Sequence, residues 1–371
     1  MSVWLSGSGS GGRMAAVAQR ATAGAEQVRD VDELDMALLD AMHVNPRASF
    51  EQLGAVLGVS SVTAARRWQR LTGTRRAWVS SAPGPRLALA AAIYEVECSP
   101  GHTDRVGRLL AALPQVASVY LTAGTFDVAA LVMAPGMSTL SELLLDRLSG
   151  TPGISRVRSN IVTNWYSDVH WRLGAISTSQ ERSVRGVDAA RDQAIEPRTL
   201  RFDQQDRELY LALQHDGRAR YVDLAETLGT SEQLVKRRLG RLTRNGTLAF
   251  RTDFTRTDGG WPTQLVLWLL VTDDRLAEVA GEIAQWRETR ICASALGPAN
   301  LLVKLQLHRL DDVEPLFARI RDTLPAATVA DRRLVLRPVK SWGRLLDTEG
   351  RCTQVVPVDL WAQPRDPISC I

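Results

Sequence analysis

The sequence predicts an α+β chain that contains one unit twice, with a helix-turn-helix at the start of each copy and a βαββαβ domain behind it. Identical residues recur at a fixed distance of 171 positions, and a strand-helix pattern recurs behind each matching segment. Stacked solenoid repeats have periods of about 20–50 residues. Each copy here is long enough to form complete domains.

The matching segments are residues 32–71 and 203–242. The residues shared by both, numbered in the first copy, include Asp32, Asp35, Leu38, Arg47, Leu53, Leu57, Gly58, Ser60, Arg66, Arg67, Arg70 and Leu71. We divide the chain into a disordered tail (1–30), a first helix-turn-helix (31–80) with its βαββαβ domain (86–170), a linker (175–199), a second helix-turn-helix (200–252) with its βαββαβ domain (262–346), and a flexible tail (347–371).

The bulk composition is that of a globular protein, with 371 residues, 45% hydrophobic residues and a net charge of +4. No apolar run reaches the roughly 18 residues that a membrane helix needs, and the Gly/Ser-rich start does not resemble a signal peptide. We expect a cytoplasmic protein. The four cysteines form no CxxC pair, the five histidines have no metal-ligand spacing, and no nucleophile motif or P-loop occurs. The sequence therefore predicts no metal, no cofactor and no enzymatic activity.

Local signals place three short helices in the first helix-turn-helix. Pro46 ends the first helix, and Ser49 with Gln52 forms a capping box that starts the second. Gly58 suits a helix C-terminus that needs positive φ, and Ser60 caps the third helix. The third helix buries one face and turns arginine outward in both copies, as in a helix that enters the major groove of DNA. A solvated charged face is the simpler alternative.

The predicted DNA contacts are Ser61, Val62, Thr63, Arg66 and Arg70 in the first copy and Glu232, Gln233, Lys236, Arg237 and Arg241 in the second. Gln233 can pair with adenine and Lys236 with guanine, whereas Val62 and Thr63 can only touch a thymine methyl group and add one hydroxyl. The arginines can hold phosphates instead of bases. Because the two copies differ, we expect one chain to act as a pseudo-dimer on an asymmetric site.

Behind each helix-turn-helix the pattern changes to strands and helices. In the first copy, strands are expected at 87–98, 116–123, 126–134 and 154–162, with helices at 102–113 and 137–148. In the second, strands are expected at 264–271, 290–296, 301–307 and 329–336, with helices at 276–286 and 313–324. Two helices cover one face of each sheet, so the other face needs a partner sheet, which the other copy supplies.

The layout resembles the Lrp/AsnC family of leucine-responsive, or feast/famine, transcription regulators, in a tandem-duplicated form. The resemblance rests on Asp35, Leu38, Arg47, Leu53, residues 58–60, Arg67, Arg70 and Leu71, on their counterparts in the second copy, and on residues 122–127. It implies a (winged) helix-turn-helix followed by a ferredoxin-like sensing domain, with double-stranded DNA and an amino acid-like small molecule as partners. It also implies homo-oligomers, built here from pseudo-dimeric chains.

The family's ligand-loop pattern, a glycine, two variable residues and an aspartate, fits Gly124, Thr125 and Asp127. In the second copy the matching residues are Gly297 and Asn300, and the amide cannot bind an amino group as a charge. The glycines also suit a hairpin turn that needs positive φ. Two alternatives stay open: an enzyme resembling sirohaem decarboxylases, which share the architecture, and a nucleoid-architectural DNA binder without a ligand.

Overall fold

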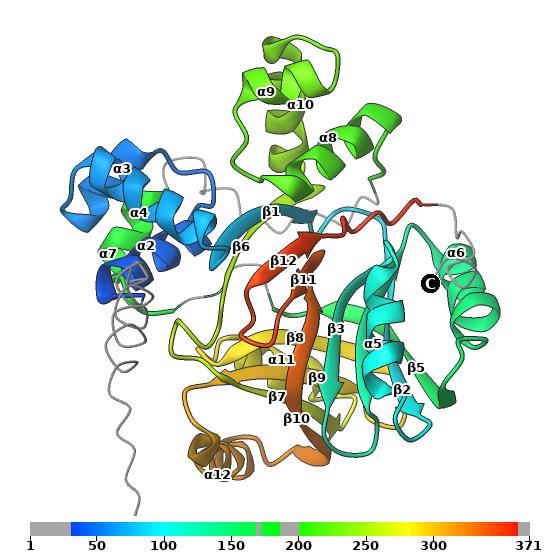
Figure 1. Ribbon diagram of the computed structural model, residues 1–371. Helices are drawn as coiled ribbons and strands as arrows, with labels where there is room; N and C mark the ends of the chain where they lie inside the picture. Colours follow the sequence, from blue (N-terminus) through cyan, green and yellow to red (C-terminus); the bar gives the residue numbers. More distant parts are fainter. Residues whose placement is uncertain (1–30, 168–170, 172, 186–199, 363–371) are drawn as a thin grey trace, which may run out of the picture. The chain divides into compact units, whose positions relative to one another are not determined.

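The structure is a computed structural model that describes residues 31–167, 171, 173–185 and 200–362 (Figure 1). The predicted tail at 1–30, most of the predicted linker and the last nine residues lie outside the described residues. None of the described helices is long and apolar enough to span a membrane.

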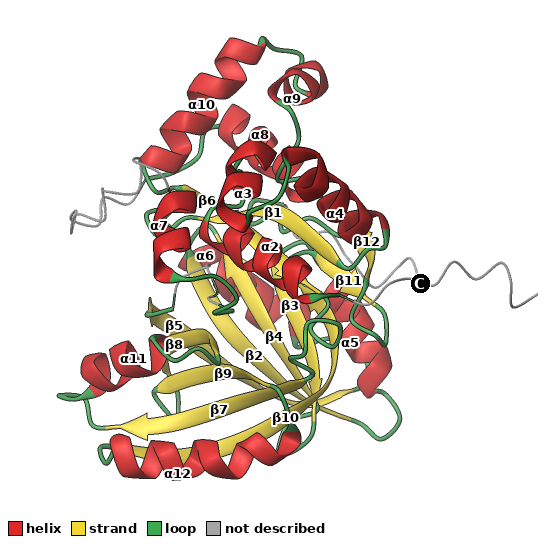
Figure 2. Ribbon diagram, turned by 90° about the vertical axis from the view of Figure 1, so that its left-hand side faces the viewer, coloured by secondary structure: helices red, strands yellow, loops and turns green. Residues whose placement is uncertain are grey.

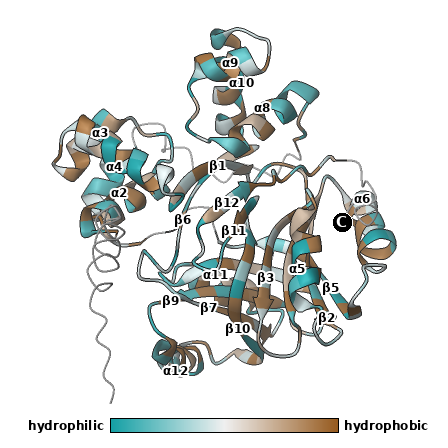
Figure 3. Ribbon diagram, in the orientation of Figure 1, coloured by the Kyte–Doolittle hydropathy of each residue, from teal (hydrophilic) through white to brown (hydrophobic). Residues whose placement is uncertain are grey.

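Each copy begins with three helices and a strand, which we call the first and second readers. The first reader comprises α2 (Glu33–Val44), α3 (Phe50–Leu57), α4 (Ser61–Gly73) and β1 (Ala77–Pro83). The second comprises α8 (Gln204–His215), α9 (Tyr221–Thr227), α10 (Glu232–Arg244) and β6 (Leu248–Phe254). Figure 3 shows that these helices contain both hydrophilic and hydrophobic residues, as expected for amphipathic helices.

The capping signals act largely as predicted. The Ser49 side chain accepts a hydrogen bond from the Gln52 N–H, Ser60 accepts one from the Thr63 N–H, and Gly58 has a φ of 68°. The capping box itself is incomplete, because the Gln52 amide donates to the carbonyls of Ser183 and Val184.

The predicted βαββαβ order is confirmed in both copies, which we call the first and second sensing domains. The first comprises β2 (Ala90–Cys98), α5 (Thr103–Ala112), β3 (Val116–Thr122), β4 (Val128–Ala134), α6 (Met137–Glu142) with a π-helical turn (Leu143–Leu148), and β5 (Ile154–Trp165). The second comprises β7 (Thr263–Val271), α11 (Leu276–Ala284), β8 (Thr289–Leu296), β9 (Leu301–Leu307), α12 (Val313–Thr323) and β10 (Ala327–Ser341).

The two sensing sheets join along both edges. Strand β5 pairs with β8, and β10 pairs with both β3 and β7, so the antiparallel pairing closes on itself (Figure 2). The two junctions are equivalent: Val162 lies opposite Ala295, and Val335 lies opposite Thr122, each residue 173 positions from its counterpart. Closure protects the sheet edges.

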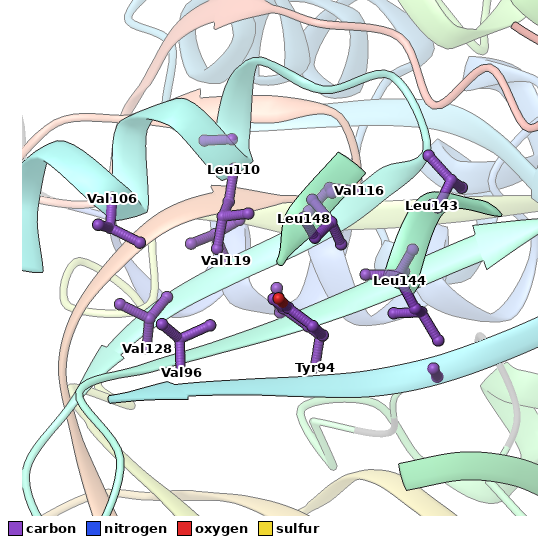
Figure 4. Packing of buried hydrophobic residues seen from close by; sticks show 14 of the residues in the cluster. Tyr94, Val96, Val106, Leu110, Val116, Val119, Val128, Leu143, Leu144 and Leu148 are labelled. Atoms are coloured by element: carbon purple, nitrogen blue, oxygen red, sulfur yellow. The ribbon is translucent and has the colours of Figure 1, made fainter. Parts of the chain in front are cut away.

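In the described part of the sensing domains, strand alternation separates three hydrophobic cores. Tyr94 and Val96 face the helices of the first sensing domain (Figure 4), and a matching core lies under α11 and α12. Ala91 and Ile93, on the other face of β2, belong to a third core formed by residues of both sheets. The predicted partner sheet is therefore the other copy.

The predicted linker and the predicted flexible tail are both partly ordered. Within the linker, α7 (Thr178–Arg185) packs on α2 and α3, and Val184 is fully buried. Within the tail, β12 (Cys352–Val355) pairs with β11 (Arg344–Leu346), which lies just before it, and Val358 and Leu360 are buried in the third core. Isolated apolar residues of this kind give no periodic signal in the sequence. Their role in packing is recognised from the structure, which shows the residues that bury them.

A histidine near a helix C-terminus can stabilise the helix as a cation, but His43, near the end of α2, does not act in this way. His43 is 1% exposed, and its ring meets Trp171 and Phe254 edge-on. Burial, reinforced by nearby Arg290, lowers the pKa of His43 well below its usual value. The folded protein therefore holds His43 neutral.

This burial predicts a loss of stability in mild acid. Because the folded pKa lies below the unfolded one, stability is complete above about pH 6.5 and falls below it by up to about 1.4 kcal/mol per pH unit. His43→Gln, which introduces the residue found at the equivalent Gln214, should flatten this dependence in urea unfolding between pH 5 and 7. His102→Gln should leave the dependence unchanged, and an unaltered slope in His43→Gln would exclude His43 as its source.

Candidate nucleic-acid interface and ligand loops

The third helix of each reader presents a polar face to solvent. Ala64, Trp68 and Leu71 are buried on one side of α4, and Val62 on the other side is 75% exposed. Ser61 and Arg66 are also exposed, and Thr63 is half-buried beside the Ser60 hydroxyl. On α10, Glu232, Gln233, Lys236 and Arg237 are all exposed.

The outward-facing Arg66 and Arg237 differ from the nearby Arg70 and Arg241 in the contacts that they make. Within the described residues, no hydrogen bond or ion pair holds the guanidinium groups of the exposed Arg66 and Arg237. Arg70 instead pairs with the buried carboxylate of Asp35, and Arg241 pairs with Asp206 at 2.5 Å. Arg70 and Arg241 thus have an ion-pair role within the reader, and their contact with DNA stays a prediction.

The same two aspartates also hold a second arginine each. Arg67 lies 2.9 Å from Asp35, and Arg238 lies 2.5 Å from Asp206. A buried carboxylate needs such partners, because an unpaired buried charge is costly. These four arginines fix the third helix of each reader against the first.

Reciprocal arginine contacts join the two readers, and sequence reasoning missed this role. Arg47 donates to the carbonyls of Gly217 and Ala219, and Arg218 donates to those of Pro46 and Ala48. Arg47 and Arg218 are equivalent residues, and so are the carbonyls that they bind. The sequence offers one signal for this role, because an arginine occurs at the equivalent position of both copies.

The strands after the recognition helices continue this pseudo-symmetry. Strand β1 pairs with β6, and Ser80 lies opposite Arg251, its own equivalent 171 positions later. A ladder centred on a residue and its own counterpart is what a two-fold axis produces. Within one chain, the readers are therefore paired as in a dimer.

Two side chains predicted to bind a ligand, those of Asp127 and Asn300, form hydrogen bonds with backbone groups of the neighbouring strand. Asp127 accepts a hydrogen bond from the Cys98 N–H at 2.7 Å. Asn300 accepts one from the Val271 N–H and donates one to the Val271 carbonyl. Cys98 and Val271 are equivalent, so Asp127 and Asn300 both tie their loop to the first strand of the sheet. Thr125 is exposed beside Asp127.

Glycine is needed at the two loop positions for different reasons. Gly124 has a φ of 122°, which confirms the predicted turn that needs positive φ. Gly297 has no positive φ, and that expectation is wrong for it. A Cβ atom on Gly297 would instead lie 2.3 Å from the Asn160 side-chain oxygen, so close packing requires glycine there.

Behind these loops lies a buried polar quartet formed by Glu95, Asn160, Trp268 and Arg333. Arg333 forms a 2.7 Å ion pair with Glu95, which also accepts hydrogen bonds from the Trp268 indole and the Asn160 amide. The four side chains are buried, and Glu95 and Trp268 are equivalent positions, as are Asn160 and Arg333. No local pattern marked this quartet, because the two halves contribute two residues each.

Two known domain families match the chain. The AsnC-type helix-turn-helix domain matches residues 31–72 and again 202–243, and the Lrp/AsnC ligand binding domain matches residues 91–169. The chain thus contains AsnC-type helix-turn-helix domains and an Lrp/AsnC ligand binding domain. It is a tandem form, with two helix-turn-helix domains in one polypeptide.

Relatives of the chain include shorter proteins that are named as transcriptional regulators. An uncharacterised HTH-type transcriptional regulator of Pyrococcus furiosus is 24% identical over 143 residues, which is 38% of this chain and 96% of that protein. An HTH-type transcriptional regulator of Methanocaldococcus jannaschii is 23% identical over 37% of this chain and 95% of that protein.

Solved structures of another protein resemble most of the chain. The sirohaem decarboxylase NirDL has a TM-score of 0.55 and 13% identity, and the likeness covers 87% of this chain and 95% of that chain. At this identity, the likeness concerns the fold.

Proposed function

We propose that this chain is a sequence-specific transcriptional regulator in which one polypeptide supplies both readers for an asymmetric DNA site. The observation that carries the proposal is the pair of exposed helix faces with outward Arg66 and Arg237, on readers joined by reciprocal arginines. The faces differ in sequence, so the two half-sites should differ as well.

Alanine at Arg66 or Arg237 tests the interface. If each arginine neutralises one phosphate, each single variant should lower the slope of log affinity against log salt by about 1 and weaken binding about tenfold. Arg309→Ala, which changes a 74%-exposed arginine side chain outside the readers, is the control. Titration of labelled genomic fragments at several salt concentrations gives both quantities. Wild-type affinity in both variants would exclude these helices as readers.

We also propose that a small molecule modulates the regulator and that chains associate further into oligomers. The family resemblance supports an amino acid-like effector at Gly124, Thr125 and Asp127, with Gly297 and Asn300 as the counterpart loop. The backbone contacts of Asp127 and Asn300 argue against a direct role for those side chains. Thermal unfolding with a panel of amino acids, and light scattering with and without DNA, test both statements.

A sirohaem decarboxylase-like activity is the second candidate, favoured by the fold likeness across most of the chain. An acidic tetrapyrrole would need histidine and arginine groups that face it together. Among the described residues, His43 is buried against aromatic rings and His308 is bound to the Gly260 carbonyl. Incubation of the protein with sirohaem distinguishes the enzyme from the regulator. A shift of the visible absorption spectrum together with release of CO₂ from sirohaem would support the enzyme.

A third candidate function is a nucleoid-architectural DNA binder. Such a protein would bind DNA with a steep dependence of affinity on salt and with no sequence preference.

A further inference from the structure

The segment that follows each sensing domain returns to a reader. Residues 171 and 173–185, which we call the first strap, follow β5 and include α7, and α7 packs on α2 and α3 of the first reader. Residues 356–362, which we call the second strap, follow β12 and contact α8 of the second reader. The two straps contact equivalent positions of the first reader helix, His43 and Gln214.

A buried carboxylate fixes the first strap to its reader. Asp40 of α2, which is 1% exposed, accepts hydrogen bonds from the backbone N–H groups of Leu173, Ala175 and Ile176 at 2.8, 2.7 and 3.1 Å. Hydrogen bonds to a carboxylate are charge-assisted and stronger than those between neutral groups. Leu211 occupies the equivalent position of the second reader, so this attachment belongs to the first copy alone.

The first strap is also bound to the sensing domain of the other copy. The Trp171 indole donates a hydrogen bond to the Arg287 carbonyl at 2.8 Å, and the Arg287 guanidinium donates one to the Leu173 carbonyl. Arg287 lies between α11 and β8, in the second sensing domain. The first strap therefore bridges the first reader and the second sensing domain.

The second strap makes the corresponding bridge. On the reader side, Asp359 pairs with Arg207 of α8 at 2.6 Å, and the Arg207 guanidinium lies 5.9 Å from the centre of the Trp361 ring. On the other side, the Ala362 carbonyl accepts a hydrogen bond from the Gln115 amide at 2.7 Å. Gln115 lies between α5 and β3, in the first sensing domain.

Both bridges end on the same loop of a sensing domain. This loop joins the first helix of the domain to its second strand, and it comprises residues 113–115 in the first sensing domain and 285–288 in the second. Gln115 and Arg287 occupy neighbouring positions of it, because Gln115 is equivalent to Glu288. The straps differ in length and sequence, so the shared end point follows from the pseudo-symmetric architecture.

The first helix of each reader is crossed in the same sense. The Thr252 hydroxyl of β6 donates to the Met42 carbonyl of α2 at 2.6 Å, and the Ser81 hydroxyl of β1 donates to the Tyr210 carbonyl of α8 at 2.7 Å. Thr252 and Ser81 are equivalent residues. Each first helix thus contacts the strand of the other copy as well as a strap that leads to the other sensing domain.

We propose that each strap couples one sensing domain to the reader of the other copy, so that the second sensing domain controls the first reader and the first controls the second. The effect on DNA rests on the proposed regulatory function, but the coupling is a property of the free protein. Coupling between distant sites is carried by packed and hydrogen-bonded elements that contact both sites, and each strap is such an element. The first connection should be the stronger, because Asp40 gives it three charge-assisted hydrogen bonds.

Hydrogen–deuterium exchange of the free full-length chain tests the coupling without DNA and without an effector. Arg287→Ala should raise exchange in α2 and α3 by about fivefold or more and leave α8 and α9 at the wild-type rate. Gln115→Ala should raise exchange in α8 and leave α2 unchanged. Arg309→Ala, which changes an exposed side chain of the second sensing domain, should alter neither reader. Equal changes in both readers, a change in the uncrossed reader, or no change in either would overturn the proposal.

Asp40 supplies the variant that disconnects the first strap. Asp40→Leu installs the residue of the second reader and should raise exchange in α3 by itself. In this background Arg287→Ala should add no further change in α3, because the connection is already lost, whereas independent sites would give additive effects. Asp40→Asn, which removes the charge at nearly constant size, replaces Asp40→Leu if that variant does not fold. Additive effects would show that the strap does not carry the coupling.

Footprinting on DNA separates the coupling from the proposed regulatory function. Arg287→Ala should reduce protection of the half-site bound by α4 and leave the other half-site protected. Crossed exchange in a chain that binds no DNA would refute the regulator and leave the coupling intact. Specific DNA binding without crossed exchange would refute the coupling alone.

Discussion

Glu95→Leu should lower the free energy of unfolding by about 3–5 kcal/mol, because it removes the buried carboxylate that pairs with Arg333 and leaves the partly exposed Asp331 to compensate that buried charge. Glu95 is fully buried, and Arg333 beside it is 1% exposed. Asp331 also binds Arg333, but its side chain is 21% exposed. The Trp268 indole and the Asn160 amide would lose an acceptor as well. Urea unfolding followed by tryptophan fluorescence measures the loss.

The double variant Glu95→Leu with Arg333→Leu separates charge pairing from packing. An apolar pair of similar volume is often as stable as a buried ion pair, so the second substitution should recover much of the loss. Arg309→Leu, at an exposed position, should change stability by less than about 0.5 kcal/mol. A double variant less stable than Glu95→Leu would contradict the charge argument.

The quartet also favours the pairing of unlike halves. In a symmetric pair of first halves, a second Glu95 would replace Trp268 and Asn160 would replace Arg333, which leaves two carboxylates facing each other. A symmetric pair of second halves would bury Arg333 without Glu95. Both alternatives carry an unpaired or repelling buried charge, which is how proteins disfavour wrong partners.

Gln233→Val with Lys236→Ala should change the sequence preference in one half-site only. The substitutions give the second reader the residues of the first, Val62 and Ala65, on a helix whose buried face is unchanged. A bidentate base contact discriminates by about 1–3 kcal/mol, so preference at the affected positions should fall about 5- to 150-fold. Sequencing of DNA selected from random duplexes by wild type and variant measures it.

The reverse exchange, Val62→Gln with Ala65→Lys, is the matched control for this experiment. It should make both half-sites alike and so favour a palindrome. Loss of preference at both half-sites in the first variant would show that the readers do not act separately.

Local signals in the sequence predicted much of the fold. Serine caps, Gly58 and the spacing of apolar residues act over a few positions, and therefore the readers and the βαββαβ order could be recognised before the structure. The duplication predicted that one sheet would cover the other, which the third core, formed by residues of both sheets, confirms. Exposure of Arg66 and Arg237 also followed from helical periodicity.

The sequence could not assign the roles of individual polar side chains. Arg70 and Arg241 have the same spacing as a DNA-facing residue, but a buried aspartate from another helix binds each of them. Asp127 fits a ligand loop, but a backbone N–H from a neighbouring strand takes its carboxylate. In each case the competing partner is remote in sequence.

The sequence by itself therefore determined the duplicated plan, the helix ends and the outward faces of the readers, since these depend on neighbours along the chain. Tertiary structure alone decided the reciprocal Arg47 and Arg218 contacts and the buried quartet. Each of these is assembled from segments more than 100 residues apart. Burial sets their energetics, because charge costs little in water and much in the interior.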